Sequence, residues 1–251
     1  MTTIPDESVL NCLLEGKLTL QGEFLWGSNY TFLLQVEHSW GEYQAVYKPT
    51  KGVRPLWDFP SPTLARREVA AYLVDQALQW NLVPPTVFRQ DAPLGPGSLQ
   101  MFIEHDPEYH YFNFSGQDRQ RLRPVALFDL LINNADRKGS HILIDPESKL
   151  WLIDHGICFH VQEKLRTVIW DFSGQPIPEN LCRDLGVLRQ KFSSQDSSLG
   201  AAQFNNRYGQ LSDYISTAEI AALFRRADRL VATGHYPDPD PSRRHYPWPA
   251  V

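Results

Sequence analysis

Short apolar runs alternate with polar or glycine-containing interruptions in the first fifth of the chain. Apolar and polar positions repeat there with a period of two, the spacing of side chains along a strand. The predicted strands are Lys17–Leu20, Glu23–Trp26, Thr31–Val36 and Tyr43–Lys48. The segments between them are Gly22, Gly27-Ser28-Asn29 and His38-Ser39-Trp40-Gly41, and residues of these types favour tight turns. This region therefore predicts an antiparallel meander.

A helix and a further strand are expected after the meander. Ser61 and Pro62 suit the N-cap and the first position of a helix that ends near Gln79, before two prolines. The apolar residues that recur at helical spacing on one face are Leu64, Val69, Leu73 and Ala77. After a Gly-Pro-Gly loop, the apolar run Ser98–Ile103 predicts another strand.

The second half of the chain has a mostly helical pattern. The helices expected there span about residues 117–132, Pro178–Phe192 and Thr217–Ala232, with Pro124 as a candidate start of the first. Between the first two, apolar runs flank a turn-forming stretch, which predicts a hairpin of His141–Ile144 with Lys149–Ile153. The segment rich in proline and aromatic residues, 234–251, is expected to pack back on the domain without regular structure.

The order of these elements predicts two unlike halves. Residues 1–104 form a sheet with one helix, residues 105–233 are mainly helical, and residues 234–251 form a tail. The halves are expected to meet near Gln100–Tyr109.

Composition narrows the classes of function. The 251 residues carry a formal net charge of −5, which disfavours nucleic-acid binding because that needs clustered Lys and Arg. No two of the three cysteines, Cys12, Cys158 and Cys182, form a CxxC pair, so we expect no disulfide framework. A reducing, cytoplasmic location is therefore expected. The sequence shows no signal peptide and no apolar run of transmembrane length, so no stable membrane association is expected.

The polar loop Asn133–Ser140 carries the residues best suited to chemistry. Pairing of the hairpin would bring Asp136, His141 and Asp154 toward one end of it. Oxygen ligands beside phosphate are the usual way to hold Mg²⁺. Asp154 ends an apolar strand, where a carboxylate needs a partner or a metal to offset its desolvation. A metal ligand, a hairpin cap and an ion-pair partner of Arg137 are all compatible with this position.

Several of these segments together resemble a known group of enzymes. They are Asn134-Ala135-Asp136-Arg137 with His141, Leu152-Ile153-Asp154-His155-Gly156, Val46-Tyr47-Lys48-Pro49, Arg67-Glu68-Val69-Ala70-Ala71-Tyr72 and Tyr246-Pro247-Trp248-Pro249. Nearly end to end, the chain resembles a bacterial family related to phosphatidylinositol 3/4-kinases, which is similar to the HipA-type kinases. The resemblance implies an α+β, two-lobed, protein-kinase-like fold with an antiparallel-sheet N-lobe and a mainly helical C-lobe. It also implies ATP and Mg²⁺ or Mn²⁺ bound between the lobes.

The resemblance assigns roles to residues of the C-lobe. Asp136 would accept or orient the proton of the attacking hydroxyl, with Arg137 beside it in the catalytic loop. Asp154 would bind the metal that bridges the ATP phosphates, and His141 would be a second ligand. Kinases of this type usually carry Asn where His141 stands, and an imidazole suits Mn²⁺ or Zn²⁺ better than Mg²⁺.

The N-lobe would bind the nucleotide. The resemblance makes Lys48 the phosphate-binding lysine and Glu68 its ion-pair partner, while Ser28 and Asn29 would lie in a phosphate-cradling turn. The residues expected on the adenine side are Met101, Phe102 and Glu104. Without the resemblance, Lys48 would be interpreted as an ordinary strand-end lysine, and the turn as a simple hairpin connection.

Together these features predict an ATP-dependent phosphotransferase that moves the γ-phosphoryl group to a hydroxyl of a protein or small molecule. Two alternatives stay open: a non-catalytic, nucleotide-binding pseudokinase, favoured by His141, and adenylyl transfer on the same fold. No Walker-type loop and no GxGxxG before a helix is present, so P-loop and dinucleotide folds are not expected. A lipid acceptor is disfavoured because the sequence shows no basic amphipathic anchor.

Overall fold

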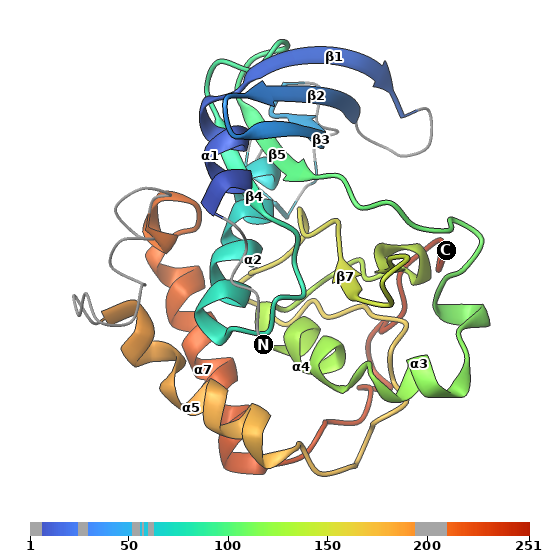
Figure 1. Cartoon of the computed structure of the whole chain (residues 1–251). Helices are drawn as coiled ribbons and strands as arrows, with labels where there is room; N and C mark the ends of the chain where they lie inside the picture. Colours follow the sequence, from blue (N-terminus) through green and yellow to red (C-terminus); the bar gives the residue numbers. More distant parts are fainter. Residues whose placement is uncertain (1–6, 25–29, 52–55, 57, 60–62, 194–209) are drawn as a thin grey trace.

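An antiparallel sheet forms the upper half of the molecule in Figure 1. The computed structural model describes residues 7–24, 30–51, 56, 58–59, 63–193 and 210–251. Within these residues the strand order is β1-β2-β3-β5-β4. The strands are β1 (Lys17–Glu23), β2 (Phe32–His38), β3 (Gly41–Pro49), β4 (Thr86–Arg89) and β5 (Gly97–Met101). All neighbouring pairs are antiparallel, so the predicted meander is confirmed and extended by two strands.

The alternation of side chains in β2 and β3 determines which face is buried. Opposite residues in the pair include Leu34 with Ala45 and Phe32 with Tyr47. The side chains of Leu34, Ala45 and Tyr47 have no exposed surface. Because successive residues of a strand point to opposite faces, Lys48 is directed away from this core.

Two details of the meander differ from the prediction. β1 continues through Gly22, where its pairing with β2 shifts register, so Lys17–Leu20 and Glu23 belong to one strand. Trp26 and the turn Gly27-Ser28-Asn29 lie outside the described residues.

Two elements of this half were not predicted. Helix α1 (Glu7–Glu15) packs on β2, β3, β4 and β5, but its apolar residues span barely two turns, too few for a clear helical period. Strand β4 has only four residues and follows two prolines, which obscures the alternating pattern. The expected single helix in this half is therefore wrong: the structure has α1 and α2 (Leu64–Leu78).

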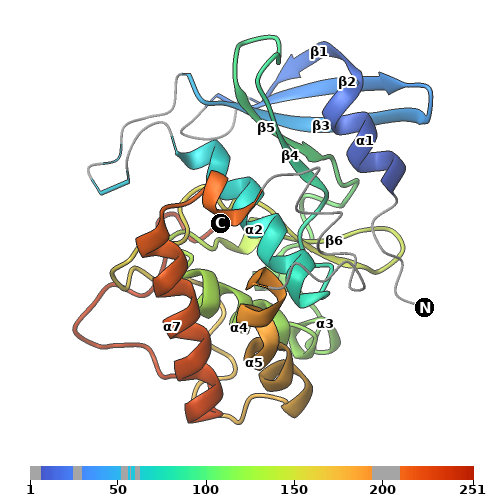
Figure 2. The ribbon, with the colours of Figure 1, turned by 90° about the vertical axis from the view of Figure 1, so that its left-hand side faces the viewer.

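Helix α2 connects the two halves (Figure 2). It packs on β4 and β5 at one side and on α5 (Glu179–Ser193) at the other, so residues around its whole circumference are buried. Its N-cap is Thr63, whereas the predicted cap Ser61 and Pro62 lie outside the described residues.

The lower half is mainly helical, as expected. Its main elements are α3 (Gly116–Gln120), α4 (Arg123–Ile132), α5, α7 (Thr217–Thr233) and the hairpin β6 (Ile142–Ile144) with β7 (Leu150–Leu152). Short 3-10 turns lie at Tyr111–Asn113, Gly139–His141 and Leu211–Asp213. The predicted helix 117–132 is divided in two: α3 is a separate short helix, and the longer helix α4 begins at Arg123, with Pro124 in its first turn.

The connection between the halves follows β5, and the tail packs on the rest of the protein. After β5 the chain runs from the sheet to the helical half (Figure 1). Ile103 packs on Leu143 and Trp151 of the hairpin. The tail packs back: Tyr236 is buried, and the Ala250 carbonyl accepts a hydrogen bond from the Gly139 N–H at 2.8 Å.

Candidate active site

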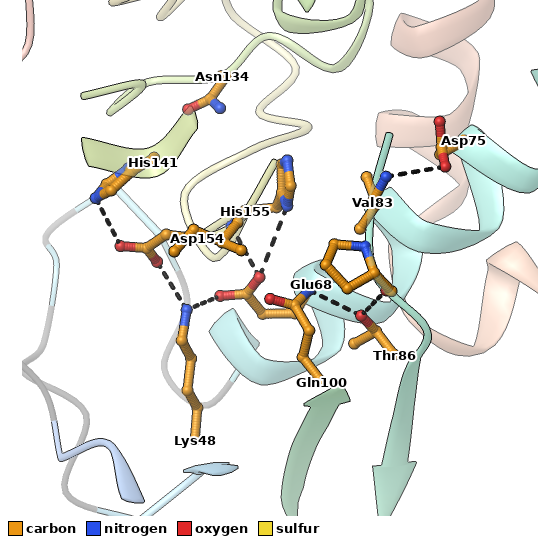
Figure 3. Close-up of polar contacts among 12 residues, drawn as sticks. Lys48, Glu68, Asp75, Val83, Thr86, Gln100, Asn134, His141, Asp154 and His155 are labelled. Carbon is orange, nitrogen blue, oxygen red and sulfur yellow. Dashed lines mark hydrogen bonds and ion pairs between the residues drawn. The ribbon is translucent and has the colours of Figure 1, made fainter. Parts of the chain in front are cut away.

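The Lys48 ammonium group lies between two carboxylates from distant elements (Figure 3). Its Nζ is 2.5 Å from Glu68 Oε1 of α2 and 2.9 Å from Asp154 Oδ1, which follows β7. The predicted Lys48–Glu68 ion pair is therefore present. Burial by itself lowers the pKa of Lys48, but the charges of Asp154 and Glu68 outweigh it and raise the pKa above its usual value.

Glu68 is held on both of its oxygens. While Oε1 contacts Lys48, Oε2 accepts a hydrogen bond from the backbone N–H of His155 at 2.8 Å. Its side chain is only 3% exposed, so this carboxylate is one of the buried charges that need partners. Burial raises the pKa of Glu68, and Lys48 opposes that rise.

Asp154 and His141 meet at the end of the hairpin, as the pairing of β6 with β7 predicts. His141 Nε2 is 3.3 Å from Asp154 Oδ2. Burial lowers the pKa of His141 to about 4, so the imidazole is neutral near pH 7. Burial would raise the pKa of Asp154, but Lys48 and His141 hold it well below its usual range.

These two side chains fit a shared metal ion. Neighbouring ligands of an octahedral ion with bonds of about 2.1 Å are about 3 Å apart, close to the separation of His141 Nε2 from Asp154 Oδ2. Among the described residues, no group of three or more His, Cys, Asp or Glu side chains is placed to hold an ion. Water and phosphate oxygens would have to complete the coordination, which is how Mg²⁺ is commonly held beside nucleotides.

Asp136 lies in the same region, in the loop before the hairpin. Its backbone N–H donates to Asn134 Oδ1 at 3.0 Å, which fixes the turn, and Lys138 Nζ is 3.5 Å from Asp136 Oδ2. Burial raises the pKa of Asp136 to about 6; Lys138 opposes the rise and the negative charge of Asp154 adds to it. A carboxylate with such a pKa accepts protons near neutral pH.

Arg137 is completely buried, and its guanidinium organises the loop. It is paired with Asp129 of α4, with Nε at 3.0 and 3.1 Å from the two carboxylate oxygens. It also donates to the carbonyls of His141 and Ile153, and its Nη2 is 2.8 Å from His155 Nε2. The alternative of an Arg137–Asp154 pair is wrong, because Asp129 occupies the guanidinium and Asp154 pairs with Lys48.

Two backbone N–H groups of the segment expected on the adenine side already donate hydrogen bonds within the protein. The N–H of Met101 donates to the Pro85 carbonyl and that of Phe102 to the Gln44 carbonyl, both at 2.9 Å. Neither N–H is therefore free for a ligand. Glu104 has an exposed side chain, and Ser28 and Asn29 lie outside the described residues.

Comparisons with known proteins agree with this geometry. The sequence profile of the family "Phosphatidylinositol 3- and 4-kinase" matches residues 63–189, which include α2, the loop 133–140 and the hairpin. The chain belongs to this family. Protein Rv2133c of Mycobacterium tuberculosis is 38% identical, and the alignment covers 100% of this chain and 97% of that protein.

More distant members and a solved structure extend the similarity. Phosphatidylinositol 4-kinase gamma 4 of Oryza sativa subsp. japonica is 31% identical over 112 residues, covering 38% of this chain and 20% of that one. The crystal structure of the Helicobacter pylori proinflammatory kinase CtkA matches with a TM-score of 0.52 at 10% identity. That match covers 89% of this chain and 94% of the other, and it shows that this family member has the kinase-like α+β fold.

Sequence reasoning missed three side chains that support the site. Asp129 and Thr167 share the buried network of Arg137, with Thr167 Oγ1 donating to Asp129 Oδ2 at 3.1 Å, and His155 bridges toward Glu68. The signal for Asp129 is its position as the lone acidic residue in the apolar helix α4, because such a carboxylate requires a cationic partner. His155 stands within the motif after β7, but neither it nor Thr167 shows in the sequence that it is buried beside Arg137 or its partner Asp129.

No α-helix in the described part of this family member combines the length and the apolarity needed to cross a membrane.

Proposed function

We propose that the protein is an ATP-dependent phosphotransferase that moves the γ-phosphoryl group of ATP to a hydroxyl of a protein or small molecule. One observation carries the proposal: the ammonium group of Lys48 lies between Glu68 and Asp154, with Asp136 close enough for the charge of Asp154 to affect its pKa. Phosphoryl transfer needs such a cation for phosphate, a carboxylate for metal and a second carboxylate for the acceptor hydroxyl.

Each residue has a proposed part in the reaction. Glu68 holds Lys48 in place, and Lys48 exchanges its contact with Asp154 for phosphate oxygens when nucleotide binds. Asp136 accepts or orients the proton of the attacking hydroxyl. Lys138, 3.5 Å from Asp136, would balance negative charge that gathers beside this carboxylate.

Asp154 and His141 are the proposed ligands of a divalent ion, Mg²⁺ or Mn²⁺. The ion would neutralise charge on the phosphates. For His141 Nε2 to be a ligand, its proton must sit on Nδ1. That tautomer gives up the 3.5 Å contact of the Lys138 N–H with His141 Nδ1, and it replaces an Nε2–H facing Asp154 Oδ2 at 3.3 Å by a lone pair that the shared ion would take.

The adenine ring is proposed to lie against the side chains of Met101 and Phe102, next to the backbone of Glu104. Ser28 and Asn29 stay candidates for phosphate contact. Arg137 has no exposed side-chain surface, which favours a positioning role over direct contact with a substrate. The resemblance alone had suggested that Arg137 is a catalytic residue in direct contact with the reacting groups.

The test uses the purified full chain with ATP and either Mg²⁺ or Mn²⁺. Water, the chain itself and vesicles containing phosphatidylinositol serve as separate acceptors, because plant relatives are named phosphatidylinositol 4-kinases. ADP release in any arm supports phosphoryl transfer, whereas pyrophosphate release would point to adenylyl transfer. A phosphate-sized mass gain on the chain would identify a protein acceptor.

Matched variants distinguish turnover at this site from turnover by a contaminating enzyme. Asp136→Asn and Asp154→Asn are each expected to reduce ADP release by about 10²-fold or more. Asp228→Asn, at a side chain that is 68% exposed on α7, is expected to behave as the native protein. Tight ATP binding without turnover in any arm would replace this proposal with a non-catalytic nucleotide-binding role. Absence of ATP binding would remove the nucleotide site altogether.

A further inference from the structure

His155, directly after the proposed metal ligand Asp154, is buried between the two halves of the site. Its side chain has no exposed surface, and its ring meets the edge of Phe128 at a centroid distance of 5.9 Å. Nothing in the proposed chemistry requires an imidazole at this position. An apolar ring would fill the same space without bringing two polar nitrogen atoms into the core.

The proton on the ring can be assigned from its neighbours. Arg137 Nη2 lies 2.8 Å from His155 Nε2, and a guanidinium can only donate. Nε2 must therefore accept, so that the ring proton of the neutral imidazole is on Nδ1.

This Nδ1–H is a buried donor without a hydrogen-bond partner. The acceptor that faces it is Glu68 Oε2, at 3.9 Å. A normal N–H···O hydrogen bond is about 2.9 Å long, so the two atoms are about 1 Å too far apart. Figure 3 draws this contact between His155 and Glu68 beside the Lys48–Glu68 pair. A buried donor without a partner is unfavourable, so forming a hydrogen bond to Glu68 Oε2 would remove that cost.

The two partners of His155 belong to different parts of the site. Glu68 is on α2 and holds Lys48, whereas Arg137 is in the catalytic loop next to Asp136. From Asp129, polar contacts lead through Arg137 and His155 to Glu68 and Lys48. Glu68 Oε2 already accepts from the backbone N–H of His155 at 2.8 Å, so a turn of the imidazole and the carboxylate toward each other would add a second hydrogen bond and hold α2, with Lys48, against the catalytic loop.

We propose that His155 is a positioning residue that donates its Nδ1–H to Glu68 in the ATP-bound state, and so fixes Lys48 against the catalytic loop. This inference rests on the proposed function and adds the residue that couples the nucleotide side of the site to the catalytic side. His155 does not touch the reacting groups; it acts through Glu68 and Arg137.

Two substitutions separate the two sides of the imidazole. His155→Gln places an amide near the position of Nε2, where it can still accept from Arg137 but is directed away from Glu68. His155→Asn places an amide N–H near the position of Nδ1, where it can still donate to Glu68 but leaves Arg137 without its acceptor. Thermal melting reports the loss at Arg137, and the Kd for ATP with Mg²⁺, measured by titration calorimetry on the full chain, reports the Glu68 contact.

The two variants are expected to affect different measurements. His155→Gln should melt near the native temperature and bind ATP about tenfold more weakly, because the hydrogen bond from Nδ1 to Glu68 in the ATP-bound state is lost. His155→Asn should melt at a lower temperature and bind ATP within about threefold of the native protein. Equal ATP affinity in native and Gln proteins would overturn the inference. So would equal weakening in both variants, since it would assign the effect to Arg137. A native protein that binds no ATP would instead overturn the proposed function itself.

Discussion

Arg67 of α2, the residue before Glu68, forms an ion pair with Glu219 of α7. Arg67 Nη2 is 2.5 Å from Glu219 Oε1, and the two side chains are only 3% and 12% exposed. Arg67 also donates from Nη1 to the Cys158 carbonyl. The other oxygen of Glu219 accepts hydrogen bonds from the Ser216 N–H and hydroxyl, which forms the capping box of α7. The informative substitution is therefore Glu219→Gln, because glutamine keeps the size and a capping acceptor and removes the charge.

The expected loss follows from burial. Removing one partner of a buried ion pair destabilises a protein by about 3–5 kcal/mol, because the other charge stays buried and uncompensated. The single amide oxygen of glutamine can keep the cap or accept from Arg67 but not both, and we expect a loss of about 3 kcal/mol. For a chain of this size, that corresponds to a fall in Tm of about 6–12 °C.

The chain offers a matched control in the Arg189–Asp228 pair, at 2.9 Å, whose side chains are 55% and 68% exposed. Asp228→Asn should cost under about 1 kcal/mol, because water already solvates both charges. The double variant Arg67→Met with Glu219→Gln should recover part of the loss, since no charge is left buried and a capping acceptor is kept. Differential scanning calorimetry checks all three. Equal shifts in the two single variants, or a double variant less stable than Glu219→Gln, would refute the reasoning.

Three further predictions concern the site. A pKa of about 6 means that Asp136 loses its proton as the pH rises through that value. Turnover should therefore rise about tenfold per pH unit below about pH 6 and level off above it. A flat pH–rate profile would contradict this. Gly97→Ala should weaken ATP binding, since its Cβ would lie 2.4 Å from the Lys48 carbonyl, whereas Gly22→Ala meets nothing within 4 Å and should have no effect by calorimetry. His141→Asn should raise the ratio of activity in Mg²⁺ to activity in Mn²⁺, because an amide oxygen is a harder ligand than imidazole; an unchanged ratio would remove His141 from the metal site.

Local pattern was sufficient for the elements that carry the site. Alternation along β3 places Lys48 on the face opposite Tyr47, and the hairpin length brings His141 near Asp154, because a two-strand pairing has only one register that buries its apolar residues. The family motifs then identified Glu68 as the partner of Lys48, and the structure contains that pair. These features depend on residues close in sequence or on motifs that recur as a unit.

Other features depended on tertiary structure. The partners of Arg137 are Asp129, eight residues before it, and His155, 18 residues after it. The Asp129 carboxylate satisfies the Arg137 guanidinium, which is why Arg137 does not pair with Asp154. Sequence alone marks a buried charge as needing a partner. It does not say which one, because that depends on which segments the fold packs together.

What the sequence by itself determined is most of the order of strands and helices, with α1 and β4 missed, the family and the residue types of the site. Periodicity and motifs record these directly, since each reflects the local geometry of one element. Only the tertiary structure decided that Lys48 contacts Asp154 as well as Glu68, and that His155 lies 3.9 Å from Glu68 with an unpaired N–H. Those distances arise from how α2, the catalytic loop and the hairpin pack. Packing is a property of the whole core, so no local pattern along the chain encodes it.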